Sequence, residues 1–81
     1  MPTILKVKDY RFFFFSREEL RKHIHIQSHN GEAKFWLDPQ IELAKNYRLN
    51  KKELNEIEKI IEENFDDFIK AWENHFESRS N

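Results

Sequence analysis

The sequence predicts an α+β domain, a small antiparallel sheet of three to four strands packed on one long C-terminal α-helix. Two observations predict this fold. Short segments rich in β-branched and aromatic residues, separated by turn residues, occupy the first half of the chain. Apolar residues at helical spacing occupy the second half, with no Pro or Gly among them. At 81 residues there is room for one core, so we predict a single domain over residues 1–77 and a polar tail at 78–81.

The first predicted strands surround a run of four phenylalanines. Residues 3–7 (TILKV) are rich in strand-forming residues, and Lys8 with Asp9 is expected to turn the chain into residues 10–15 (YRFFFF). A polar stretch follows. Residues 23–27 (HIHIQ) then alternate, with both isoleucines on one side and both histidines on the other. This alternation predicts a strand with one apolar face.

A hairpin is predicted next. Asn30 and Gly31, the only glycine, form the strongest turn signal in the chain and lead into a strand at residues 33–37. Pro39 interrupts that strand because it has no N–H to donate. Residues 41–44 are expected to resume as a short edge strand, although this segment also suits a helical turn.

One long helix is predicted for the second half. Asn50 is the expected N-cap, with Glu53 three residues on as in a capping box. A helix of about 27 residues is roughly 40 Å long, whereas a short strand spans roughly 17–20 Å. Its far end, at Trp72 and Phe76, should therefore overhang the sheet. Either the helix bends, or these two rings pack on another subunit.

The phenylalanine strand is apolar on both faces. Phe12 and Phe14 point one way, and Phe13 and Phe15 the other. Trp36 likewise points away from the apolar side of its own strand. One helix covers only one face of a sheet, and a face open to water should carry polar residues. The second face is therefore expected to need a cover.

Exposed apolar area of this kind usually marks an interface. We expect a homodimer, or a small dedicated protein partner, to cover the second face or the helix end. The alternative is that residues 16–22 and 39–49 fold over that face. The predicted partner-binding residues are Phe13, Phe15, Trp36, Trp72 and Phe76.

Charge is unevenly distributed. Residues 1–52 carry 11 Lys/Arg and 6 Asp/Glu (+5), residues 53–81 carry 3 and 9 (−6), and the sum is the net −1. This asymmetry indicates a basic binding surface beside an acidic helix, or two halves that attract each other. The chain has no cysteine, which excludes disulfides and thiolate zinc sites. No signal peptide and no membrane span is predicted, so the expected location is the cytoplasm.

Two histidines suggest a chemical role. His23 and His25 should project from one face of a strand, where a pair of imidazoles can act as acid and base near neutral pH. Arg11 or Lys34 on nearby strands would stabilise an anion. The predicted catalytic residues of such a site, acting on RNA or another phosphoryl substrate, are His23, His25 and Arg11. The alternative is that these histidines are solvated or lie in an interface.

Metal binding is not predicted. His29 could join His23 and His25 only if the hairpin bends suitably, and no carboxylate completes a ligand set. The chain offers no Gly-rich phosphate loop, and no cofactor is expected. The alternative role for the aromatic residues is a platform on which bases of a single-stranded nucleic acid stack, but aromatic stripes at strand spacing are more often core.

Several segments together resemble a bacterial protein family, the domain of unknown function 4160. They are, in order, YRFFFFS, HIHI, AKFWLDP and KELNEIEKIIEENFDDFIKAWENHF, and the resemblance runs from Pro2 to about Phe76. The residues that match are Tyr10, Arg11, Phe12, Phe13, residues 23–26 and residues 33–37. Arg21-Lys22 stands where the family commonly has two prolines, so the loop before His23 is expected to differ.

The resemblance implies a biological context. Members of this family are small, stand-alone cytoplasmic proteins, often encoded beside a protein of the domain of unknown function 2442, in pairs that look like toxin–antitoxin modules. By this resemblance the chain is expected to be the toxin-like member, bound by a small antitoxin-like partner. The alternative is a non-catalytic homodimeric or heteromeric interaction module without toxin activity.

Overall fold

The computed structural model describes residues 3–15 and 21–77, and it shows an α+β fold. Within these residues five strands form one antiparallel sheet in the order β1-β2-β3-β4-β5, so each strand pairs with its neighbours in sequence. Two helices and a π-helical segment follow. The strands are β1 (Thr3–Val7), β2 (Tyr10–Phe13), β3 (His23–Gln27), β4 (Glu32–Trp36) and β5 (Glu42–Tyr47). The helical elements are α1 (Lys51–Glu63), α2 (Phe65–Trp72) and η1 (Glu73–Glu77).

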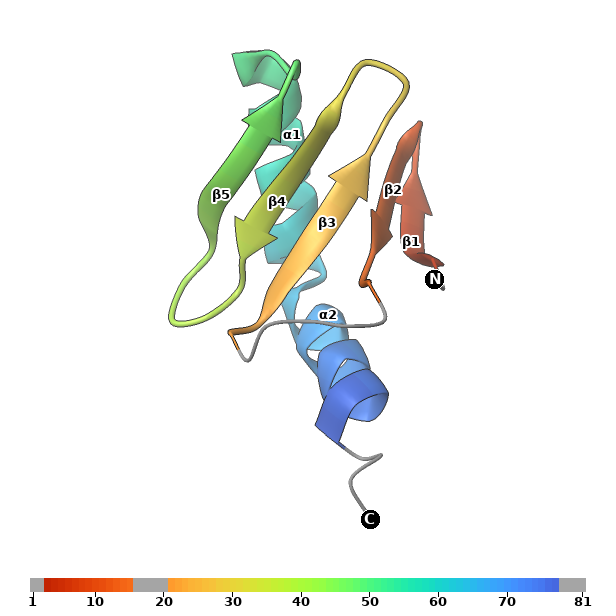
Figure 1. Ribbon diagram of the computed structural model, residues 1–81, viewed down its shortest axis with the longest axis vertical. Coiled ribbons are helices and arrows are strands. Elements are labelled where there is room, and N and C mark those ends of the chain that lie inside the picture. The colour runs from red at the N-terminus through yellow and green to blue at the C-terminus, as the bar shows by residue number, and fades with distance from the viewer. Residues whose placement is uncertain (1–2, 16–20, 78–81) are drawn as a thin grey trace.

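The helices cover one face of the sheet. Figure 1 views the molecule from the other side, with the strands in front, α1 running behind them and α2 leading beyond the lower end of the sheet. The prediction of three to four strands is wrong, because β5 is a full strand of six residues paired with β4. Its weak sequence pattern follows from its edge position, where nearly every side chain is exposed.

The prediction of one long C-terminal helix is also wrong, because the helix breaks at Asn64. The backbone N–H of Asn64 donates to the carbonyls of Ile60 and Ile61, and its side-chain amide also donates to Ile60 O at 2.8 Å. An Asn side chain that bonds the preceding turn competes with helix propagation. Of the two expectations for the helix end, bending is therefore the one observed, and α2 begins at Phe65.

The core lies between the helices and the face of the sheet that they cover. Phe12 and Phe14 are fully buried on this side, with the Phe12 ring centroid 5.5 Å from that of Phe68 and the Phe14 centroid 5.3 Å from that of Trp72. The predicted alternation of the phenylalanines is confirmed. The predicted helical stripe is confirmed as well: Ile57, Ile61, Phe68 and Trp72 are buried, and Leu54, Ile60, Phe65, Ile69 and Phe76 pack against the core.

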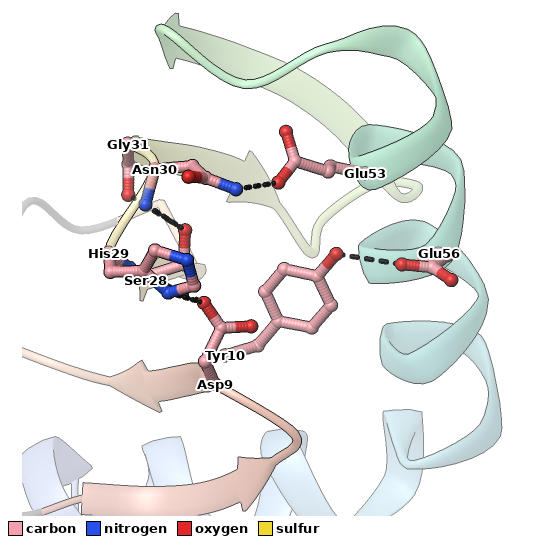
Figure 2. A network of polar contacts seen from close by, with 8 residues as sticks. All are labelled: Asp9, Tyr10, Ser28, His29, Asn30, Gly31, Glu53 and Glu56. Atoms are coloured by element: carbon pink, nitrogen blue, oxygen red, sulfur yellow. Dashed lines mark hydrogen bonds and ion pairs between the residues drawn. The ribbon is translucent and has the colours of Figure 1, made fainter.

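A polar network joins two strand connections to the start of α1 (Figure 2). The amide of Asn30 donates to Glu53 at 2.7 Å, and the hydroxyl of Tyr10 donates to Glu56 at 2.7 Å. His29 forms an ion pair with Asp9. The predicted capping box at Asn50 is present, with both of its hydrogen bonds. These contacts fix the helix start against the β1–β2 turn and the β3–β4 hairpin.

Gly31 is required in that hairpin by a close approach of backbone. A Cβ atom at this position would overlap the carbonyl oxygen of Tyr47 in β5. The hairpin predicted at Asn30 and Gly31 is confirmed by the antiparallel pairing of β3 and β4 on either side of it. The turn at Lys8 and Asp9 is confirmed too, with Lys8 at a φ of 55°.

The network predicts how stability depends on pH. The backbone of Asn50 and the side chain of Asn30 lower the pKa of Glu53, and the hydroxyl of Tyr10 followed by the Lys8 ammonium lowers that of Glu56. A carboxyl group with a lowered folded pKa stabilises the fold above its unfolded pKa, and this stability is lost as pH falls through the folded pKa. Burial, and then the bond to Glu56, raises the pKa of Tyr10, so stability should also fall as pH rises above the ordinary tyrosine value of about 10.

We expect the urea midpoint to drop at both ends of the pH range. The variant Glu56→Gln should be less stable than wild type near neutral pH and should lose less stability on acidification, because its side chain cannot be protonated. Glu62→Gln, an exposed position on the same helix, is the matched control and should follow wild type. This expectation would be contradicted if the urea midpoints of wild type and Glu56→Gln fell by the same amount as the pH is lowered.

Candidate functional site: the open face of the sheet

The face of the sheet turned away from the helices, here called the open face, carries its side chains in rows. Directly paired residues of antiparallel strands point to the same side, and the register therefore defines each row. The central row consists of Phe13, His25, Lys34 and Lys45, one from each of β2 to β5. The row near the β3–β4 hairpin consists of Arg11, Gln27, Glu32 and Tyr47, and the row at the opposite end of His23, Trp36 and Glu42.

Cations lie over the aromatic rings of this face. The guanidinium of Arg11 is 4.5 Å from the centroid of the Phe13 ring. Arg21 and Lys34 both approach Trp36, at 4.1 and 4.4 Å from its ring centroid. Such contacts are cation–π interactions. Because a cationic group lies over each of these rings, the surface above Phe13 and Trp36 is positively charged and not purely apolar.

An aromatic cluster surrounds His25 on the same face. The rings of Phe13 and Phe15 lie 5.6 and 4.4 Å from the His25 ring, centroid to centroid. Phe13 is largely buried in this cluster at 7% exposure, whereas Phe15 is 40% exposed. Phe15 is therefore the member of the pair that meets solvent.

His23 occupies a different environment from His25. Its side chain is only 1% exposed, and its ring lies 5.6 Å from that of Trp36 and 5.2 Å from that of Trp72. Its Nδ1 is 2.7 Å from the carbonyl oxygen of Arg21. A carbonyl only accepts, so Nδ1 carries the proton. His23 is thus a packed, hydrogen-bonded ring at the end of the sheet, and a substrate in solvent does not reach it in this arrangement.

Lys34 and Lys45 are direct cross-strand neighbours. Like charges in this position are unfavourable, and His25 stands directly opposite Lys34 on the other side. A hollow of about 430 Å³ lies here, with His25, Lys34, Lys45, Asn46 and Tyr47 among the residues that line it. The two lysines place positive charge on the β4–β5 side of the open face. The carboxylate of Glu32 also lines this hollow, and a further anionic group bound there would relieve the repulsion between the lysines.

A second hollow of about 430 Å³ continues the basic character toward the β1–β2 turn. It is lined by Lys6, Lys8, Asp9, Arg11, Gln27, Ser28 and His29. Arg11 is held in place by donating to Thr3 Oγ1 at 2.7 Å and to Gln27 Oε1 at 3.2 Å. The two hollows lie near opposite edges of the sheet, and both are suited to anionic groups.

The predicted site residues are distributed between this face and the core. Arg11, His25, Phe13, Phe15 and Trp36 come together on the open face. Trp72 lies in the core at 3% exposure, because the bend at Asn64 lets α2 pack on Phe14 and does not leave that ring overhanging. Phe76 is half-buried and packs beside Trp72, with ring centroids 4.3 Å apart. The catalytic and partner-binding roles themselves stay predictions.

Several cations of the open face were not predicted from the sequence, among them Lys6, Arg21 and Lys45. Lys45 and Tyr47 belong to β5, which the sequence pattern placed at residues 41–44 only. Once β5 extends to Tyr47, its alternation puts both side chains on the open face. Of the segments proposed to fold over that face, residues 42–47 instead lie in the sheet, and residues 16–20 lie outside the described residues.

Neither a metal centre nor a membrane span is found in the part of the chain that the structure describes. No group of three or more His, Cys, Asp or Glu side chains is arranged there to hold a metal ion. No helix among these residues is both long and apolar enough to cross a bilayer.

Comparison with known proteins gives one match. A family model described as a domain of unknown function, DUF4160, matches residues 9–73. Searches of curated proteins and of solved structures found no match. The matched segment contains β2 to β5, both helices and nearly the whole open face.

Proposed function

The chain belongs to the DUF4160 family, a domain of unknown function, and on that premise we propose that it is a binding module whose open face takes an acidic surface of a small protein. In the toxin–antitoxin-type pair implied by the resemblance, this chain is the toxin-like member. The antitoxin-like partner silences it by covering the same face with which it contacts its target.

The observation that carries this proposal is the charge of the open face. Five cations belong to it among the described residues, against two carboxylates, those of Glu32 and Glu42. The cations are Lys6, Arg11, Lys34 and Lys45 from the strands, and Arg21 over Trp36. Carboxylates of a partner would pair with these side chains, and the opposed lysines of the central row would lose their mutual repulsion.

Three features favour a protein over a nucleic acid. Single-stranded nucleic acids bind sheets by stacking bases on aromatic rings, but here Arg11 covers Phe13, and Trp36 carries two cations. The exposed ring of Phe15 suits the apolar part of a protein interface. The net charge of −1 is also unlike that of a general nucleic-acid binder.

A titration followed by amide NMR shifts tests the partner class. The probes are a synthetic peptide of alternating Glu and Leu, and a uridine oligonucleotide of matched charge. We expect the peptide to shift amides of β2 to β5 and to bind the variant Lys34→Glu/Lys45→Glu at least about tenfold more weakly, a loss of about 1.4 kcal/mol. The control Lys59→Glu/Lys70→Glu makes the same change in net charge on the exposed helix surface and should bind as wild type does.

Two outcomes contradict the binding proposal. One is a peptide that binds equally well to all three proteins, and the other is an oligonucleotide that binds the open face more tightly than the peptide. Growth of a bacterial host after induced expression tests the toxin-like role separately. Wild type should arrest growth, and the open-face variant at equal soluble level should not. Unchanged growth with wild type would overturn the toxin-like role alone.

A further inference from the structure

We propose that a second copy of this chain binds along the free edge of β5, antiparallel to it, so that two sheets join into one. This interface lies along the edge of the open face and shares Glu42, Lys45 and Tyr47 with it, but it does not depend on the function proposed above. It rests on the exposure, apolar content and charge pattern of a single edge strand.

The first observation is that β5 is an uncovered edge. It is the longest strand of the sheet, with six residues, and it pairs only with β4 among the strands of the described residues. Its outer side appears at the left of Figure 1, where no other labelled element lies beside it. An edge of this kind leaves a row of backbone N–H and C=O groups available for another strand.

The second observation is the apolar content of this edge. Leu43 and Tyr47 are 42% and 64% exposed, and they are two of the three exposed large hydrophobic residues among those described. Leu43 is opposite the core residue Phe35, and Tyr47 is opposite Glu32 of the open face. One added strand would therefore lie beside apolar area on both sides of the sheet.

The two edge strands differ in their apolar content and not in their regularity. The pairing with the neighbouring strand is irregular in both, and a residue with positive φ follows each strand, Lys8 after β1 and Arg48 after β5. Among the described residues, exposed large hydrophobic side chains lie on β5 and not on β1. Apolar area therefore favours β5 as the edge that adds a strand.

The charge pattern of β5 identifies a second copy as the occupant. Ala44 is an extra residue opposite β4, so Glu42 and Lys45 both point to the open face although they are three apart. An antiparallel copy centred between Leu43 and Ala44 places Glu42 of each chain opposite Lys45 of the other. The strand is thus complementary to itself, with two opposite-charge pairs related by a two-fold axis.

The joined sheet would also extend the basic surface. In this register the central row of each copy would continue across the interface into the row of the other copy that ends at Glu42. The open faces of the two copies would thereby form one continuous surface. Each Glu42 would neutralise part of the positive charge at the centre, next to its own contact with Arg21 at 3.7 Å.

Sedimentation equilibrium over protein concentrations from about 10 μM to about 1 mM tests the interface. We expect wild type to dimerise and Leu43→Glu to remain monomeric. The matched control is Phe15→Glu, which places the same charge at a side chain of similar exposure on the open face, and it should dimerise as wild type does. Circular dichroism checks that each variant is folded.

The register is tested by cross-linking, which the absence of native cysteine makes unambiguous. Equal amounts of Glu42→Cys and Lys45→Cys should form a disulfide-linked dimer on oxidation, in larger yield than either variant alone. The mixed dimer keeps one Glu42–Lys45 pair intact. In the sedimentation experiment, two results would overturn the proposal. One is that wild type stays monomeric at every concentration. The other is that Phe15→Glu abolishes the dimer while Leu43→Glu keeps it. A more efficient cross-link within one variant would overturn the register.

Discussion

Replacing Phe14 with alanine is expected to remove about 3–5 kcal/mol from the free energy of unfolding. Phe14 is fully buried, and its ring contacts Trp72 and Phe76 at centroid distances of 5.3 and 5.9 Å. The substitution would leave a cavity between the sheet and α2. Small domains have a total stability of about 5–15 kcal/mol, so this single substitution removes a substantial fraction of the stability.

The neighbouring residue supplies the control. Phe15→Ala removes the same group one position along the chain, but Phe15 is 40% exposed on the open face. We expect it to cost roughly 1 kcal/mol, chiefly through its contact with His25. Urea denaturation followed by circular dichroism would measure both variants. Equal losses would contradict the assignment of Phe14 to the core side and of Phe15 to the open side.

Replacing His23 with alanine is the second large effect that we expect, a loss of about 2–4 kcal/mol of stability. The ring fills space between Trp36 and Trp72 and donates a hydrogen bond to the carbonyl of Arg21. Removing it creates a cavity and leaves that carbonyl without this donor. His25→Ala should cost less, because His25 is only half-buried.

This difference matters for any functional test of the two histidines. If His23→Ala abolishes an effect in cells, its soluble level and urea midpoint must first be compared with those of His25→Ala. We expect the activity lost in His23→Ala to be proportional to the amount of folded protein lost. A His23→Ala variant as stable as wild type that nevertheless loses a measurable activity would contradict a purely structural role and favour the catalytic prediction.

Local patterns in the sequence were sufficient where one physical cause dominates. Strict alternation along the phenylalanine strand placed Phe12 and Phe14 on one side and Phe13 and Phe15 on the other. The Asn50 and Glu53 pair fixed the helix start, because capping depends on residues only three apart. The Asn30-Gly31 pair located the hairpin, although the reason for glycine there, the carbonyl of Tyr47, comes from a strand far along the chain.

Other features depend on contacts between distant segments. β5 has little apolar character of its own and becomes a strand because β4 supplies its hydrogen-bond partners. The break at Asn64 has a local cause, since its side-chain amide bonds the carbonyl of Ile60 four residues earlier, but the apolar spacing continues through it and therefore did not predict the break. His23 and His25 look equivalent in the sequence, but in the structure they differ because Trp72 of α2 packs against the ring of His23.

The sequence by itself therefore determined the α+β class, the two faces of the central strands and the helix start, because periodicity and capping are local properties. Only the tertiary structure decided which histidine is buried and which lysines stand opposite each other on the open face. Those outcomes depend on register and on packing between residues tens of positions apart. Neither is encoded in the spacing of any single segment.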